Sequence, residues 1–191
     1  MLTQAFAYKC WSDRRALDAI ARIDHQRFPD EYAFALQQLN HMAIVEDLFR
    51  ARLSGEADPH PATNTQAVPG YDALRERLLT SGQWYVEQLA ALTPERAREV
   101  IRFRFTDGRS GSLSREEMFF HILNHATYHR GSIARALDQA GVAHPADTYT
   151  VFVHATEPGR REGSRAARSI GLPGAQSKVP RRVSMKLRGS P

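Results

Sequence analysis

The stretch SREEMFFHILNHATYHRGSIARALDQAG, residues 114–141, has the pattern of one long amphipathic helix. Ser114, with Glu117 three residues later, matches a capping box, so the helix should begin near Arg115. Gly141 follows as a typical C-terminal stop. On a helical wheel, six apolar side chains fall within about 100° and form the side that faces a core. They are Phe119, Ile122, Leu123, Ala126, Ile133 and Leu137.

That apolar side needs other helices packed against it, and three further segments have helical patterns. They are residues 2–23, 30–53 and 71–92. The segment SGEADPHPATNTQAVPG, between the second and the third, is rich in Pro, Gly, Asn and Thr, as is typical of a long crossover loop. The sequence therefore predicts an all-α protein, a bundle of four helices.

Between the third and the fourth helix the apolar period changes to that of β-strands. Ile101, Phe103 and Phe105 alternate with two arginines. Asp107 and Gly108 then supply a favourable hairpin turn. We expect a small two-stranded β-hairpin whose apolar face lies on the bundle, because isolated hairpins are only marginally stable.

The positive charge of the chain is concentrated near its end. Nine Lys or Arg residues and two Glu residues lie in residues 155–191, so that segment carries +7, the whole chain +5 and residues 1–154 −2. A nearly neutral body argues against a nucleic-acid-binding fold. Because few large apolar side chains follow residue 156, we expect a folded domain over residues 1–156 and a basic, disordered tail over 157–191.

Cys10 is the only cysteine. It excludes an intrachain disulfide and favours a reducing compartment. The first residues lack the apolar core of a secretory signal. No uncharged apolar run is long enough to span a membrane. We therefore expect a cytoplasmic, soluble protein without membrane contact.

Three histidines, His121, His125 and His129, lie at intervals of four on one flank of the predicted helix. Neighbouring imidazoles in such a series are about 6 Å apart along the axis and can converge on one ion, whereas His121 and His129 are about 12 Å apart. At most one adjacent pair can share a metal. Burial favours His125 with His129, because metal sites usually lie in partly dry surroundings.

A third ligand has to come from another element, and His41 is the candidate. It lies in LQQLNHMAIVEDLF, residues 36–49, whose apolar side chains surround the helix and predict burial. A buried neutral histidine needs a polar partner. Weaker candidates, in predicted loops or at element ends, are His25, His60, His144 and His154.

Histidines at this spacing are also common as surface residues or as hydrogen-bonded core residues, and that alternative stays open. The chain lacks the HExxH motif of zinc proteases, because Ala126 stands where the catalytic Glu would follow the first histidine. It also lacks the Glu-x-x-His pair of di-iron bundles.

Arg130 lies within the apolar stripe of the predicted helix, so its guanidinium should be buried and needs an acidic partner. Glu46 is the candidate for that partner. Gly131 lowers helix propensity, which suggests that something packs close to the backbone there.

Several motifs are shared with a known family. LNHM (39–42), HILNHATYHRG (121–131), YKCWSD (8–13) and GVAHPADTY (141–149) together resemble the DinB-like family of proposed metalloenzymes. The family more often has Asn where Asp13 stands. The resemblance covers residues 1 to about 155.

The resemblance implies an up-down-down-up four-helix bundle and a homodimer. It also implies a divalent metal ion, zinc or nickel, held by His41, His125 and His129. His121 matches a family position that is often histidine without being a ligand.

Other side chains near the expected ligands are candidates for supporting roles. Asn124 and Tyr128 flank the two helical histidines and either orient a substrate or only pack. Arg130 directly follows His129 and belongs to the same surroundings. No general acid or base is identifiable from the sequence.

We interpret the sequence as a metal-dependent enzyme that acts on a small molecule, of the hydrolase or thiol S-transferase type, with a low-molecular-weight thiol as candidate cosubstrate. Three neutral histidines leave coordination positions open, where a metal can activate water or bind a thiolate. The alternative is a non-catalytic bundle that binds metal or ligand for sensing or assembly. A third hypothesis gives the basic tail nonspecific, salt-sensitive contact with nucleic acid or an anionic surface.

Overall fold

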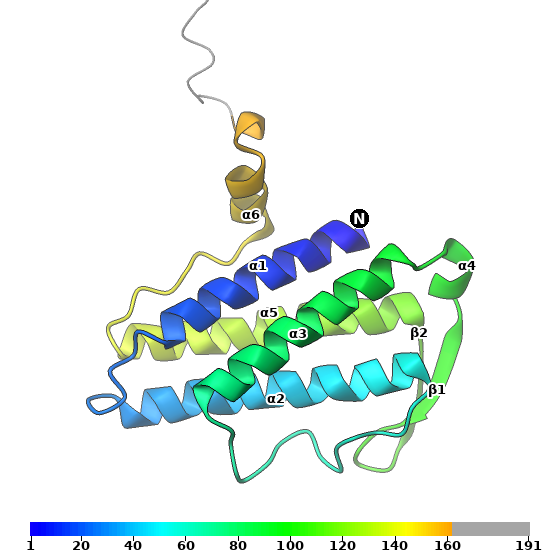
Figure 1. Cartoon of the computed structure of the whole chain (residues 1–191), viewed down its shortest axis with the longest axis horizontal. Helices are drawn as coiled ribbons and strands as arrows, with labels where there is room; N and C mark the ends of the chain where they lie inside the picture. The colour runs from blue at the N-terminus through cyan, green and yellow to red at the C-terminus, as the bar shows by residue number, and fades with distance from the viewer. Residues whose placement is uncertain (162–191) are drawn as a thin grey trace, which may run out of the picture.

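Four long helices make up most of the computed structural model, which describes residues 1–161 (Figure 1). They are α1 (Leu2–Ile20), α2 (Pro29–Ser54), α3 (Tyr71–Ala90) and α5 (Arg115–Gln139). The all-α class and the four predicted helices are confirmed, although α1 ends at Ile20 instead of near residue 23. Most of the predicted disordered tail, residues 162–191, lies outside the described part of the chain.

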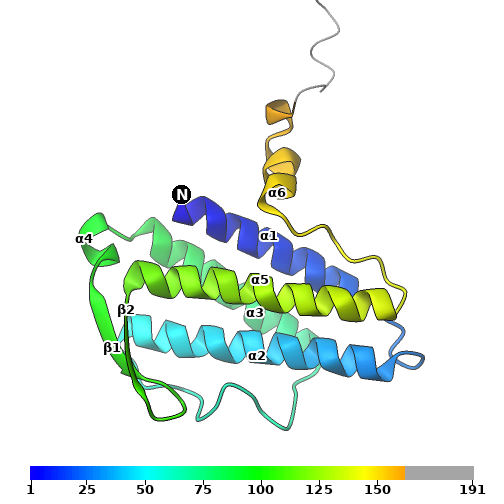
Figure 2. The same ribbon diagram turned by 180° about the vertical axis from the view of Figure 1, so that it is seen from behind.

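The helices have up-down-down-up connectivity. Helices α2 and α3 run in the same direction, opposite to α1 and α5 (Figure 1). Helix α5 packs against α1 and α2, and α3 packs against the same two helices from the other side (Figure 2). Because α2 and α3 are parallel, the loop of residues 55–70 has to return along the bundle, which explains its length.

Helix α5 begins and ends as predicted. The Ser114 hydroxyl oxygen accepts a hydrogen bond from the Glu117 N–H at 3.2 Å, and Glu117 Oε2 accepts from the Ser114 N–H at 2.7 Å. Gly141 has a φ of 69°, in the left-handed region that favours glycine after a helix. The capping box therefore fixes the start of the helix that carries most of the candidate site.

The predicted hairpin is also present. Strands β1 (Val100–Arg104) and β2 (Ser110–Ser114) are antiparallel, with Ile101 opposite Leu113. Gly108, in the turn between them, has a φ of 85°. Apolar side chains of both strands pack on one end of the bundle core, as expected for a ribbon that needs support.

Three short elements were not predicted from the sequence: α4 (Pro94–Ala97), α6 (Tyr149–Thr156) and the 3-10 turn η1 (Pro158–Arg160). Helix α6 stands away from the four long helices beside α1 (Figure 1). It is held there by Phe152, whose ring centroid lies 5.9 Å from that of Tyr8 and 5.7 Å from that of Trp11.

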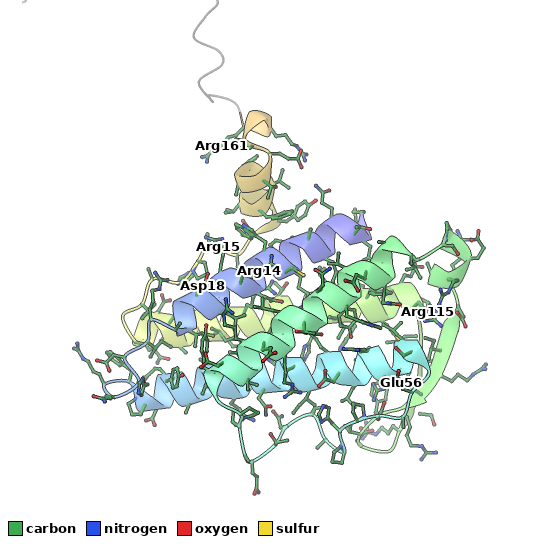
Figure 3. All side chains as sticks on the ribbon, in the orientation of Figure 1. Arg14, Arg15, Asp18, Glu56, Arg115 and Arg161 are labelled. Carbon is green, nitrogen blue, oxygen red and sulfur yellow. The ribbon has the colours of Figure 1, made fainter. Side chains whose placement is uncertain are left out.

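Most charged side chains lie on the outer faces of the bundle. Arg14, Asp18 and Glu56 are exposed examples (Figure 3). Within residues 1–161, no helix combines the length and the apolar character that a membrane span requires. In this described part of the chain, the exceptions to the outward placement of charge are five buried residues, Lys9, Asp13, Glu46, Arg52 and Arg130.

Candidate metal centre

Three histidines converge where α2 and α5 pack together. His41 comes from α2, and His125 and His129 come from α5; one ring nitrogen of each lies within 4.8 Å of the other two. The Nε2 atom of His125 is 3.0 Å from Nε2 of His41 and 3.1 Å from Nε2 of His129. All three rings are half-buried. The structure thus brings together the three residues that the sequence and the resemblance pointed to.

The outer nitrogens of two of these rings are held by acceptors. His41 Nδ1 lies 2.8 Å from the backbone carbonyl oxygen of Thr63, and His129 Nδ1 lies 2.7 Å from Oε1 of Gln38. A carbonyl oxygen can only accept, so each Nδ1 carries the hydrogen and donates it. The Nε2 atoms of His41 and His129 are then left with lone pairs that face His125.

This arrangement of lone pairs fits a shared cation. A neutral His125 with its hydrogen on Nε2 could donate to only one of the two neighbouring lone pairs, and the other would face an unfavourable contact. Two nitrogens bound to one zinc ion at about 2.0–2.1 Å lie about 3.0–3.4 Å apart when the angle at the metal is about 95–110°. Both Nε2 separations fall in that range. The three rings could therefore hold a divalent metal ion.

Burial also keeps the rings of His125 and His129 in the neutral form that binds metals. It lowers the pKa of His125 to about 3, with His129 and His41 adding to the effect. Burial lowers the pKa of His129 to about 4, with a further contribution from His41. Protons therefore compete weakly for these nitrogens at neutral pH.

Comparison with known proteins agrees with the motifs and the fold. The model of the DinB family matches residues 1–162. The chain belongs to the DinB family. No curated protein and no solved structure gives a significant match.

The crossover loop positions His41 on α2. Gln37 Nε2 donates to Asn64 Oδ1 at 3.0 Å, and Asn40 Nδ2 donates to Thr65 Oγ1 at 2.8 Å. These contacts, made by the two residues that follow Thr63, hold its carbonyl against His41. Neither Thr63 nor Gln38 was identified from the sequence, because their roles depend on the path of the loop and the packing of α2 on α5.

Three of the remaining residues expected around the ligands, His121, Asn124 and Tyr128, have exposed side chains. His121 is exposed, and its ring stacks on those of His125 and Phe49, with centroids 5.5 Å and 4.6 Å away. Asn124 is also exposed. Tyr128 is 72% exposed, and its ring meets the His129 ring edge-on at 5.1 Å. In this DinB-family chain all three residues are exposed, and the rings of His121 and Tyr128 contact the cluster.

Arg130 belongs to a different site, and its predicted pairing with Glu46 is wrong. It is buried, as expected, but Nη1 contacts Asp13 and Nε contacts Asp147, both at 2.7 Å. The wheel placed Arg130 correctly on the inner side of α5. It could not show that this side turns toward α1 at that position, away from the histidines.

The predicted partner, Glu46, pairs with a different cation. Lys9 is fully buried, and its Nζ lies 2.7 Å from both Asp13 Oδ2 and Glu46 Oε1. Burial alone would lower the pKa of Lys9, but the two carboxyl groups outweigh it and raise that pKa. For Glu46, burial raises the pKa, and the nearby charge of Asp13 acts in the same direction. Asp13 thus links Lys9 to Arg130 across the inside of the bundle.

Proposed function

We propose that this chain is a metal-dependent enzyme that acts on a small molecule, with His41, His125 and His129 holding a divalent ion, zinc or nickel. The observation that carries the proposal is the convergence of three Nε2 atoms, with the His41 and His129 rings fixed by hydrogen bonds that their Nδ1 atoms donate. Imidazole ligands suit zinc and nickel.

The reaction type that we propose is hydrolysis or thiol S-transfer. A metal with three protein ligands keeps positions for water or a thiolate, and it lowers the pKa of either. Tyr128, whose ring contacts that of His129, and Asn124, which precedes His125, are proposed to orient a substrate. A low-molecular-weight thiol as cosubstrate and a homodimer, both expected from the resemblance, remain predictions.

One observation favours a second candidate, a bundle that binds metal without turnover. Within residues 1–161, the histidine cluster includes no carboxylate. A general base next to the metal is a usual part of hydrolytic sites, although bound water can also be activated by the metal alone. An activity measurement separates the two candidates.

Zinc added to metal-free protein is expected to raise the melting temperature, because an ion that binds only the folded state stabilises it. The gain is about 2.7 kcal/mol when free zinc is 100 times Kd, and calorimetry with and without zinc measures it. Untagged protein avoids added histidines. An unchanged melting temperature at saturating zinc would contradict a native-state site.

Turnover is expected to depend on both metal and the histidines. Zinc- or nickel-loaded protein should be assayed with p-nitrophenyl acetate for hydrolysis, and with 1-chloro-2,4-dinitrobenzene plus cysteine, glutathione or coenzyme A for thiol transfer. We expect one of these reactions to proceed at least about 100-fold faster than with the His125→Ala variant, as for loss of metal-assisted catalysis.

The matched control is His121→Ala, which removes a histidine one turn earlier on the same helix and should keep the activity. Stoichiometric metal without turnover in any of these assays would instead support the binding-only candidate.

A further inference from the structure

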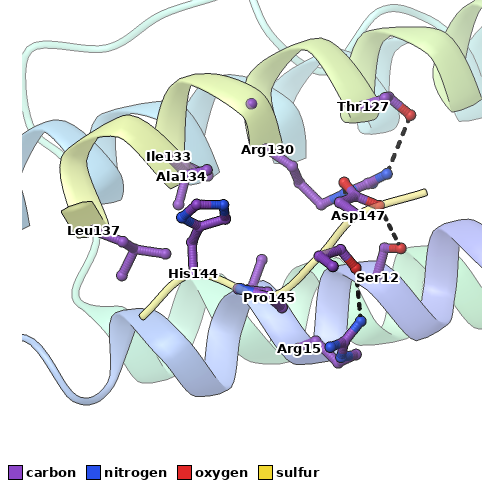
Figure 4. A pocket seen from close by; sticks show the side chains of 13 residues that line it. Ser12, Arg15, Thr127, Arg130, Ile133, Ala134, Leu137, His144, Pro145 and Asp147 are labelled. Atoms are coloured by element: carbon purple, nitrogen blue, oxygen red, sulfur yellow. Dashed lines mark hydrogen bonds and ion pairs between the residues drawn. The ribbon is translucent and has the colours of Figure 1, made fainter. Parts of the chain in front are cut away.

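A cavity of about 250 Å³ lies on the other flank of α5 from the histidines, between α5, α1 and the segment that follows α5. Its apolar part is formed by Ala16 of α1 and by Ile133, Ala134 and Leu137 of α5. His144 and Pro145, from the following segment, also line it (Figure 4). The cavity is large enough for a small organic molecule.

Gly131 also lines this cavity, and nothing in the protein requires a glycine there. It lies in the interior of α5, where glycine is less favourable than alanine. A Cβ atom built on Gly131 would meet no other atom within 4 Å. The close packing that the sequence suggested at this position is therefore absent. The missing side chain instead leaves helix backbone open to the cavity.

The charged side chains that line the cavity differ in their partners. Asp147 accepts hydrogen bonds from Tyr8, Ser12 and Arg130 at 2.6–2.7 Å, so its charge is fully engaged. Arg15 differs. One of its nitrogens donates to the carbonyl oxygen of Ala146 at 2.9 Å, and within residues 1–161 it forms no ion pair with a carboxylate.

We propose that this cavity is a second ligand site, which takes a small and largely apolar carboxylate. The apolar part of the ligand lies on Ile133 and Leu137 and approaches the backbone at Gly131. Its carboxylate binds Arg15, whose cation has no acidic partner in the described part of the chain. The ligand is bound between two helices and the segment 143–147, apart from the histidine cluster.

Benzoate and benzyl alcohol test the proposal as probes of nearly equal size, one anionic and one neutral. Binding is followed by amide chemical shifts of the full-length protein. We expect benzoate to bind with a Kd of about 1 mM and to shift amides of residues 127–137 and 143–147. Benzyl alcohol should bind about tenfold more weakly, as for loss of one charge-assisted hydrogen bond.

Two variants fill the cavity, a third removes the charge of Arg15, and a fourth tests the helix at position 131. Gly131→Leu should weaken benzoate binding at least about tenfold. If that variant folds poorly, Ala134→Met replaces it in the test and should have the same effect. Arg15→Gln should reduce benzoate to the affinity of benzyl alcohol and leave the alcohol unchanged. Gly131→Ala should raise the melting temperature, since the methyl group meets no atom of the protein.

A carboxylate can also bind a metal, so every titration is repeated with the metal-free His125→Ala variant. Unchanged benzoate binding in that variant supports the second site even if the chain proves to have no metal-dependent activity. Loss of binding in His125→Ala, equal affinity for the two probes, or full affinity in the filled variants would each overturn the proposal.

Discussion

His41→Ala is expected to lower zinc affinity by more than about 100-fold, because it removes one of three ligands. Loss of a partner that only orients a ligand already lowers metal affinity by about 10–100-fold. His125 and His129 would remain, on a single helix, and two imidazoles do not complete a zinc site. Metal content of untagged protein after dialysis, with competition against a chelator, measures the change.

The matched control for this variant is His121→Ala. In the native protein the His121 ring stacks on that of His125 but offers no nitrogen to the cluster. We expect His121→Ala to keep stoichiometric zinc, and circular dichroism of both variants excludes unfolding as the cause of metal loss. Full zinc retention by His41→Ala, or equal loss from both variants, would show that the ligand assignment is wrong.

Asp13→Ala is expected to destabilise the fold by about 3–5 kcal/mol, because it leaves two buried cations without their shared partner. Asp13 is 4% exposed and contacts Lys9 Nζ and Arg130 Nη1, each at 2.7 Å. Removing its carboxylate is costlier than removing a surface charge, since the side chains of Lys9 and Arg130 are buried away from water. Urea denaturation of both proteins measures the difference in unfolding free energy.

The stabilisation that Asp13 provides should decrease as the pH falls. Burial alone would raise the pKa of Asp13, but Lys9 and Arg130 outweigh it and lower the pKa. A lowered folded-state pKa gives stability that is present above the unfolded value of about 3.9 and is lost as pH falls further. The difference between wild type and Asp13→Ala should therefore shrink in acid.

Asp138→Ala provides the comparison on the surface of the molecule. Asp138 pairs with His144 at 2.7 Å, but both side chains are more than 40% exposed. Its loss should cost less than about 1 kcal/mol. Equal costs for Asp13→Ala and Asp138→Ala would contradict the view that the buried pairs hold α1 to α5.

The elements that the sequence predicted well are those with local signals. The capping box of Ser114 and Glu117 sets the start of α5, and the alternation around Ile101 and Phe103 marks the hairpin. Helix α6 was missed because its eight residues are too short for a clear helical period. Its position depends on contacts of Phe152 with α1, which no local pattern shows.

For the site, spacing on one helix identified His125 and His129, and burial together with the family resemblance added His41. The contacts that orient these rings could not be predicted, because Gln38 and Thr63 approach only when the bundle and its crossover loop are folded. The partners of Arg130 were missed for a related reason. Asp13 lies 117 residues from Arg130 in the chain, and a helical wheel gives no information about contacts between different helices.

The contact between Thr63 and His41 has an evolutionary consequence. Thr63 acts through its main-chain carbonyl, so any residue at that position could supply the same acceptor as long as the loop keeps its path. Selection on the metal centre would then act on the length and anchoring of residues 55–70, through neighbours such as Asn64 and Thr65, while the identity of residue 63 drifts. Related chains should differ freely at that position and still orient the same imidazole.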